Sequence, residues 1–66
     1  MRITINGQLT ETAEDITLQE LLAGRAIKGS GVITELNGQI VQFESRPATK
    51  LSPNDTLEII RIIGGG

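Results

Sequence analysis

The chain opens with strict alternation of apolar and polar residues. Met1, Ile3 and Ile5 would share one side of an extended segment, and Arg2 and Thr4 would share the other. A period of two is typical of a strand with one buried face and one exposed face. The first five residues are therefore predicted to form a half-buried β-strand.

A hairpin turn is predicted directly after this strand. Asn6 and Gly7 both tolerate the positive φ angles of a two-residue turn, and this pair is the strongest short hairpin signal. Residues 8–12 should then return as a second strand, with Leu9 pointing inward. A second pair of this kind, Asn37-Gly38, is expected to join strands at 32–36 and 39–42.

The segment after the first hairpin carries a helix start. Thr17 and Glu20 have the spacing of a capping box, in which each residue's side chain bonds the other's backbone amide. The apolar residues that follow the cap fall on one helical stripe: Leu18, Leu21 and Leu22. The helix is predicted over residues 18–25, ending at or near Gly24, with its stripe packed on the sheet.

The stretch from 43 to 50 is predicted to be irregular. Pro47 argues against a central strand, because it has no amide proton for a strand ladder. Leu51 is expected to return to the core. Of the strand at 32–36, the residues predicted to face inward are Val32, Thr34 and Leu36.

The last strand is expected over residues 56–63 and is apolar on both sides. In a sheet with a helix on one face only, some of its isoleucines must stay exposed. Ile60 and Ile62 are predicted to lie on the helix-free face, where Ile33 would extend them into a docking surface for partner proteins. The alternative is strand propensity without function. Arg61 is expected to pair with an acidic group of a partner or with a neighbouring carboxylate.

The composition excludes several functions. The 66 residues include no cysteine and no histidine, which excludes disulfides, thiolate chemistry, a Ser-His-Asp triad and histidine-bound metals. No catalytic residue and no metal ligand set is therefore predicted. Phe43 is the only aromatic residue and the net charge is −2, so nucleic-acid binding is not expected. No apolar stretch is long enough to span a membrane.

The order of elements predicts an α+β fold. Two strands, a helix and three further strands suit a mixed four- to five-stranded sheet with one helix across one face. The final strand should lie centrally, parallel to the first. This is the β-grasp, or ubiquitin-like, architecture. The predicted domain covers residues 1–63, and 64–66 form a flexible glycine tail.

The glycine tail predicts a chemistry in which its terminal carboxylate is activated. Gly64, Gly65 and Gly66 carry no side chains, so such a segment can enter a channel too narrow for other residues. An ATP-dependent enzyme can convert the terminal carboxylate to an acyl-adenylate, which a sulfur or nitrogen nucleophile can attack. The tail holds no base, nucleophile or metal ligand, so it would be a substrate or carrier and not an enzyme. The alternative is a frayed, inert end.

The chain resembles the ThiS-type sulfur carriers of thiamine biosynthesis over nearly its whole length. The resemblance depends on length, element order and four stretches: Met1 to Gly7, Thr17 to Leu22, Val32 to Gly38, and Leu51 to Ile60 before the terminal glycines. It differs from the family after the fourth strand, where members often have Pro-Arg and an aromatic residue and this chain has Phe43 to Pro47. The third glycine also leaves the register of Gly64 against partners open.

The resemblance implies a function and partners. Gly66 would be adenylated by an E1-like enzyme of the ThiF type and converted to a thiocarboxylate, with Gly65 as its thin neighbour. The sulfur would come from a cysteine desulfurase and pass to a thiazole synthase of the ThiG type. ATP would be used by the partner, and no cofactor would be bound. The carrier is expected to be a cytoplasmic monomer. Three alternatives stay open: another thiolation pathway, a ubiquitin-like modifier, and a plain interaction domain.

Overall fold

The fold is a five-stranded sheet with one α-helix across one face. A computed structural model describes residues 1–62. The strands are β1 (Arg2–Ile5), β2 (Gln8–Glu11), β3 (Val32–Leu36), β4 (Gln39–Val41) and β5 (Thr56–Arg61). The helix is α1 (Leu18–Gly24), and two short 3-10 helices are η1 (Gly29–Gly31) and η2 (Phe43–Ala48). The expected α+β architecture is confirmed.

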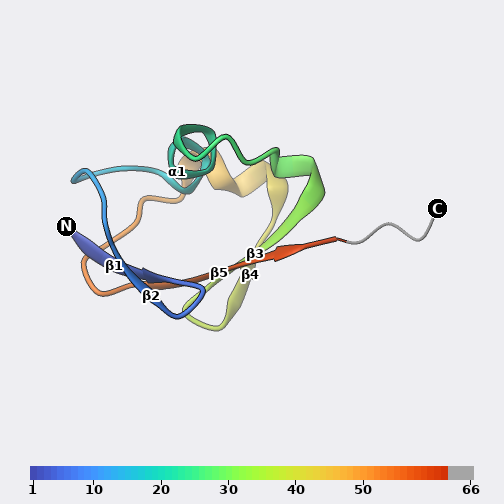
Figure 1. Ribbon diagram of the computed structural model, residues 1–66. Helices are drawn as coiled ribbons and strands as arrows, with labels where there is room; N and C mark the ends of the chain where they lie inside the picture. Colours follow the sequence, from blue (N-terminus) through green and yellow to red (C-terminus); the bar gives the residue numbers. More distant parts are fainter. Residues whose placement is uncertain (63–66) are drawn as a thin grey trace.

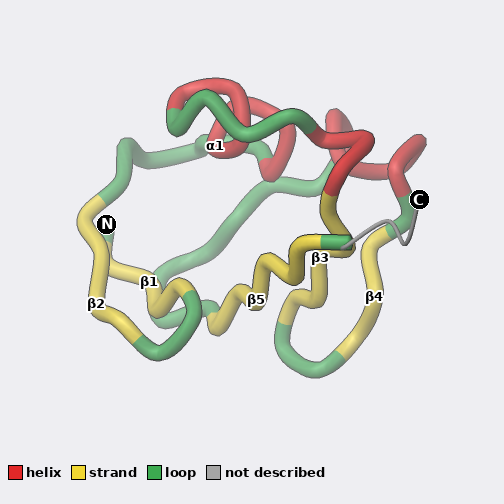
Figure 2. Tube along the Cα trace, turned by 45° about the vertical axis from the view of Figure 1, so that its right-hand side comes forward, coloured by secondary structure: helices red, strands yellow, loops and turns green. Residues whose placement is uncertain are grey.

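The strand order places β5 in the middle of the sheet. Across the sheet the order is β2-β1-β5-β3-β4, which Figure 2 shows from one edge to the other. β5 runs parallel to β1 and antiparallel to β3. Figure 1 shows α1 and both 3-10 helices on the same side of the sheet, which leaves its other face uncovered. The predicted central position of the last strand is therefore confirmed.

The core lies between α1 and the covered face of the sheet. It is built from aliphatic side chains: Ile3, Ile5, Leu18, Leu21, Leu22, Leu51 and Leu57. Met1, Leu36 and Ile59 are partly buried and pack against it. The inward positions predicted from alternation in the first and third strands are thus correct, and so is the return of Leu51.

The helix begins at the predicted capping box. The Glu20 amide donates to Thr17 Oγ1 at 3.1 Å, and the Thr17 amide donates to Glu20 Oε1 at 2.9 Å. The first of these bonds satisfies an amide of the first turn, which has no partner within the helix, and the second fixes the cap residue itself. Hydrogen bonding to the Glu20 carboxyl by the Thr17 backbone amide, and less strongly by the Thr17 side chain, lowers the pKa of that carboxyl.

The prediction for Leu9 is wrong. Leu9 lies opposite Thr4 in the β1–β2 ladder and is 73% exposed. Facing residues of an antiparallel pair share one side of the sheet, and Thr4 lies on the side away from Ile3 and Ile5. Leu9 therefore belongs to the helix-free face. The inward side of β2 is instead occupied by Thr10, which faces Ile3.

The prediction that residues 43–50 are irregular is wrong for residues 43–48. Residues 43–48 form η2, and Pro47 lies near its end. Arg46 from this helix is buried, with 3% exposure. Its guanidinium donates to Thr34 Oγ1 at 3.1 Å and to the carbonyls of Gly29 and Val32 at 2.8 and 2.9 Å. Arg46 therefore fastens η2 to η1 and to the start of β3.

Ile63 and the three terminal glycines lie outside the described residues, and so does the predicted boundary at 63 and 64. Within residues 1–62, no helix is long and apolar enough to cross a membrane.

Candidate functional site

The end of β5 is the base from which residues 63–66 continue, and β3 holds it in place. Arg61 lies opposite Val32, and Ile60 lies opposite Ile33. Past the strand, the Ile62 amide donates to the Gly31 carbonyl at 3.0 Å. Because Arg46 fixes the Gly29 and Val32 carbonyls on either side of Gly31, the last described residue is held against a fixed segment.

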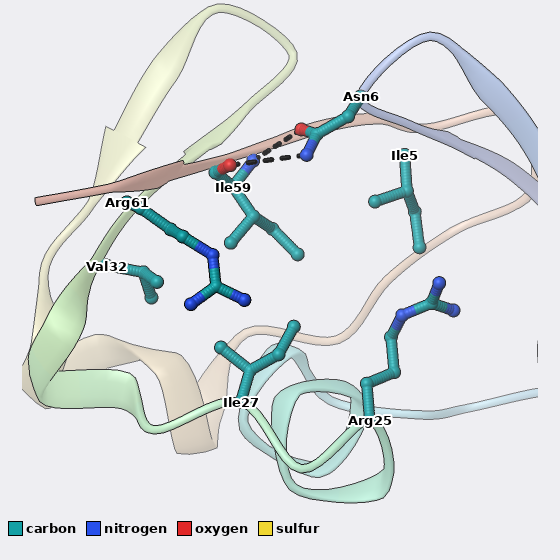
Figure 3. A pocket seen from close by; sticks show the side chains of 7 residues that line it. All are labelled: Ile5, Asn6, Arg25, Ile27, Val32, Ile59 and Arg61. Carbon is teal, nitrogen blue, oxygen red and sulfur yellow. Dashed lines mark hydrogen bonds between the residues drawn. The ribbon is translucent and has the colours of Figure 1, made fainter.

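On its other side, β5 is held by a side chain. β1 ends at Ile5, so its ladder with β5 includes only two register pairs, Thr4 with Thr56 and Ile5 with Leu57. The Asn6 side chain continues this ladder. Its Oδ1 accepts from the Ile59 amide at 2.7 Å, and its Nδ2 donates to the Ile59 carbonyl at 3.2 Å (Figure 3). Asn6 is thus both a turn residue with φ 48° and a clamp on β5.

The helix-free face beside the end of β5 is apolar. Ile60 is 47% exposed and Ile33, directly opposite, is 38% exposed. The next pair along the two strands is Glu35 and Glu58, both half-buried. Ile33 and Ile60 therefore form a small apolar surface bordered by two carboxylates.

The predicted third member of this surface, Ile62, is 55% exposed. It lies past the last residue of β5 and also lines a hollow together with Ala26, Ile27 and Lys28, which follow α1. Ile62 therefore lies at the end of the sheet, where it also borders the helix side.

The helix side of the same end contains a pocket of about 150 Å³. Four aliphatic residues line it, Ile5, Ile27, Val32 and Ile59, with Asn6 at one side. Two arginines complete the pocket. Arg61 is the last residue of β5, and Arg25 is the C-cap residue of α1. Figure 3 shows their guanidinium groups reaching into the space between sheet and helix.

Arg61 has no ion pair with any residue that the structure describes. The ion pairs within residues 1–62 join Arg2 to Glu11 and the N-terminal amine to Glu14. Of the two partners expected for Arg61, a neighbouring carboxylate is thus not found in this part of the chain.

Gly64, Gly65 and Gly66, predicted to carry the chemistry, lie outside the described residues. Over residues 1–62, no group of three or more metal-ligating side chains is present.

Sequence patterns did not reveal three contributors to this region: Arg25, Arg46 and the clamping function of Asn6. The Asn-Gly pattern predicts only the turn, and the second function of Asn6 depends on a contact with a residue 53 positions away. Arg46 lies in a stretch without periodicity, and Arg25 lies at the end of the predicted helix, outside its apolar stripe. For Arg46, the only signal in the sequence is its position beside Pro47 in a stretch with no strand pattern.

Comparison with known proteins places this arrangement in a family. The model of the ThiS family matches residues 3–66. The chain belongs to the ThiS family. It is 32% identical over 65 residues to the sulfur carrier protein ThiS of Bacillus subtilis, covering 97% of this chain and 98% of that protein.

Two further relatives of this ThiS family member bear on its function. The crystal structure of the thiamine biosynthesis protein ThiS from Geobacter metallireducens matches with a TM-score of 0.88 and 32% identity, over all of both chains. A thiazole synthase of Paramagnetospirillum magneticum is 32% identical over 66 residues. There the whole of this chain corresponds to 20% of the longer protein.

Proposed function

We propose that this protein is a sulfur carrier of thiamine biosynthesis whose C-terminal Gly66 bears the sulfur as a thiocarboxylate. The observation that carries the proposal is the ThiS family match, which extends from residue 3 to residue 66 and so includes the terminal glycines. The clamped end of β5 supports it, because a rigid base holds a thin tail at a defined position for a partner enzyme.

The chemistry takes three steps. The Gly66 carboxylate attacks the α-phosphorus of ATP, which gives an acyl-adenylate and releases pyrophosphate. The terminal sulfur of a persulfide then displaces AMP to form an acyl disulfide. A thiol cleaves that disulfide, which frees the thiocarboxylate and leaves a new disulfide between the thiol and the persulfide's carrier. Each step belongs to a partner, so the chain is a co-substrate and not an enzyme.

Three partners follow from this sequence of steps. They are an E1-like adenylating enzyme of the ThiF type, a cysteine desulfurase as the persulfide source, and a thiazole synthase of the ThiG type as the sulfur acceptor. ATP is consumed by the first of them, and the chain binds no cofactor of its own. The ThiS-like segment within a longer thiazole synthase supports the third, because covalent linkage keeps donor and acceptor together.

The surface formed by Ile33, Ile60 and Ile62 is the proposed docking site for the adenylating enzyme. These side chains are exposed and lie at the base of residues 63–66. Burying them would hold the tail in register during adenylation, since exposed apolar residues at a functional end are typical of interaction surfaces. The carrier is proposed to act as a monomer in the cytoplasm, where a chain without cysteines has no need of an oxidising compartment.

Removal of Gly65 and Gly66 tests this function. The truncated chain and the full chain are incubated with a ThiF-type enzyme, ATP and a persulfide donor, and sulfur incorporation is measured. The truncated chain should keep its melting temperature, because both glycines lie beyond β5, and should take up no sulfur. Sulfur loading that survives the truncation would contradict the proposal.

A further inference from the structure

The distribution of positive charge on this chain is uneven. Of its six lysines and arginines, Arg2 pairs with Glu11, Arg46 is buried, and Lys50 lies close enough to Glu20 to help lower the pKa of that carboxyl. The other three, Arg25, Lys28 and Arg61, line the two adjoining hollows on the helix side at the end of β5. A chain of net charge −2 thus gathers half of its cations at one place.

The smaller hollow, the pocket between Arg25 and Arg61, has the features of an anion site. No Asp or Glu lines it. Apart from the two arginines it is lined by Asn6 and four aliphatic residues, none of which places a negative charge beside the guanidiniums. Each guanidinium presents a planar fork of donors that matches the two oxygens of a carboxylate.

The size of the pocket limits its ligand. The pocket has a volume of about 150 Å³ and shares Ile27, Val32 and Arg61 with the adjoining hollow. Typical pockets for small molecules and cofactors are at least about 300 Å³. A carboxylate on a short side chain fits such a space.

The position of the pocket identifies the source of that carboxylate. Arg61 is the last residue of β5 and Ile62 borders the adjoining hollow, so any enzyme that takes up residues 63–66 must approach this rim. We infer that the pocket between Arg25 and Arg61 receives an acidic side chain, Asp or Glu, of the adenylating enzyme. The identity of that partner depends on the proposed function, whereas anion binding by the pocket does not.

Nuclear magnetic resonance of the ¹⁵N-labelled full chain tests the pocket by itself. Sodium acetate is the carboxylate probe, titrated against sodium chloride at equal ionic strength. The Nε–H signals of Arg25 and Arg61 and the amide signals of Ile27 and Ile59 should shift saturably with acetate only. In Arg61→Gln the saturation should disappear. In Lys50→Gln, which changes the net charge equally at a distant site, it should persist.

Two outcomes of this titration would overturn the inference. Shifts that grow linearly and equally with both salts would show that no site is present. Saturation by inorganic phosphate without saturation by acetate would show a phosphate site and not a carboxylate site.

Affinity for a ThiF-type enzyme, measured by calorimetry, tests the partner. Arg25→Gln and Arg61→Gln should each weaken binding by about fivefold or more, and Lys50→Gln by less than about twofold, because only a buried or closely docked charge pair contributes strongly. If both arginine variants bind like Lys50→Gln while the unmodified chain binds and is loaded with sulfur, the inference fails and the proposed function stands. If the unmodified chain is neither bound nor loaded, the proposed function fails, and the acetate titration still decides whether the pocket binds carboxylates.

Discussion

The Asn6 side chain takes the place of a missing β1 residue against Ile59. Its Oδ1 accepts from the Ile59 amide at 2.7 Å, and its Nδ2 donates to the Ile59 carbonyl at 3.2 Å. β1 has already ended at Ile5, so this amide group extends the ladder on that side of β5. The turn residue of the first hairpin therefore fixes the strand that leads to the terminal glycines.

Replacing Asn6 by glycine should loosen this end of β5. Glycine tolerates the positive φ of position 6, so the variant removes the two bonds and leaves the turn possible. The expected cost is about 1 kcal/mol, because net hydrogen-bond contributions are of that order. Hydrogen exchange at the Ile59 amide should become faster than at the core amides. Asn6→Asp keeps the acceptor but turns the donor into an oxygen that faces the Ile59 carbonyl, so it should retain part of the protection. Unchanged exchange in Asn6→Gly would contradict the clamp.

The capping box predicts a particular pH dependence. The hydrogen bonds with Thr17 lower the pKa of Glu20 below its usual 4.5, so the folded state favours the carboxylate. Its contribution to stability is therefore present above pH 4.5 and lost as the pH falls through the lowered value. The melting temperature of the unmodified chain should exceed that of Glu20→Gln at pH 7, and the difference should shrink as the pH falls below 4.5. A difference independent of pH would contradict this origin.

Arg46 is predicted to be essential for stability. Arg46→Met would leave the carbonyls of Gly29 and Val32 without their donors. Each unsatisfied buried group costs about 1–3 kcal/mol. Removing the buried charge offsets part of this cost, so the free energy of unfolding in urea should fall by about 2–4 kcal/mol. An unchanged midpoint would show that water replaces these bonds.

Gly29 should depend on Arg46 in the same way. A Cβ at Gly29 would lie 2.9 Å from Arg46 Nη1, whereas a Cβ at Gly31 would meet no atom within 4 Å. Gly29→Ala should therefore destabilise the chain in urea unfolding by about 1 kcal/mol or more, and Gly31→Ala should not. In the Arg46→Met background the cost of Gly29→Ala should shrink. Equal costs in both backgrounds would mean that the two residues are independent.

Ile60 is predicted to contribute to binding more than to folding. Ile60→Asp places a charge in the middle of the proposed docking surface and should weaken the complex with a ThiF-type enzyme at least tenfold. Its melting temperature should change little, because the side chain is already 47% exposed. Leu9→Asp is the matched control, since Leu9 is on the same face but two strands away, on β2. Equal weakening by both substitutions, or a large loss of stability, would contradict the assignment.

The sequence was most informative where local rules and burial agree. Alternation predicted the inward residues of β1 and β3, and the spacing of Thr17 and Glu20 predicted the helix start. The central position of β5 followed from its apolar residues on both faces. In these elements one local pattern determines which side chains are buried.

The sequence was least informative where contacts join distant segments. Leu9 is the apolar residue of a short strand, which favours an inward position, but the register with β1 decides its face, and β2 is an edge strand. Buried Arg46 violates the rule that charges stay outside, and its acceptors are backbone carbonyls, which no composition reveals. The pocket between Arg25 and Arg61 likewise requires the packing of α1 on the sheet.

The most direct test of the sulfur-carrier function is the mass of the C-terminal peptide. The chain is incubated with a ThiF-type enzyme and a persulfide donor, with and without ATP, and is then cleaved after Arg61. Isolating the peptide of residues 62–66 is necessary because oxidation of Met1 gives nearly the same mass change in the intact chain. The expected result is one oxygen replaced by sulfur on this peptide, with ATP only. An unchanged peptide, from enzymes that load a known ThiS protein in the same assay, would contradict the account.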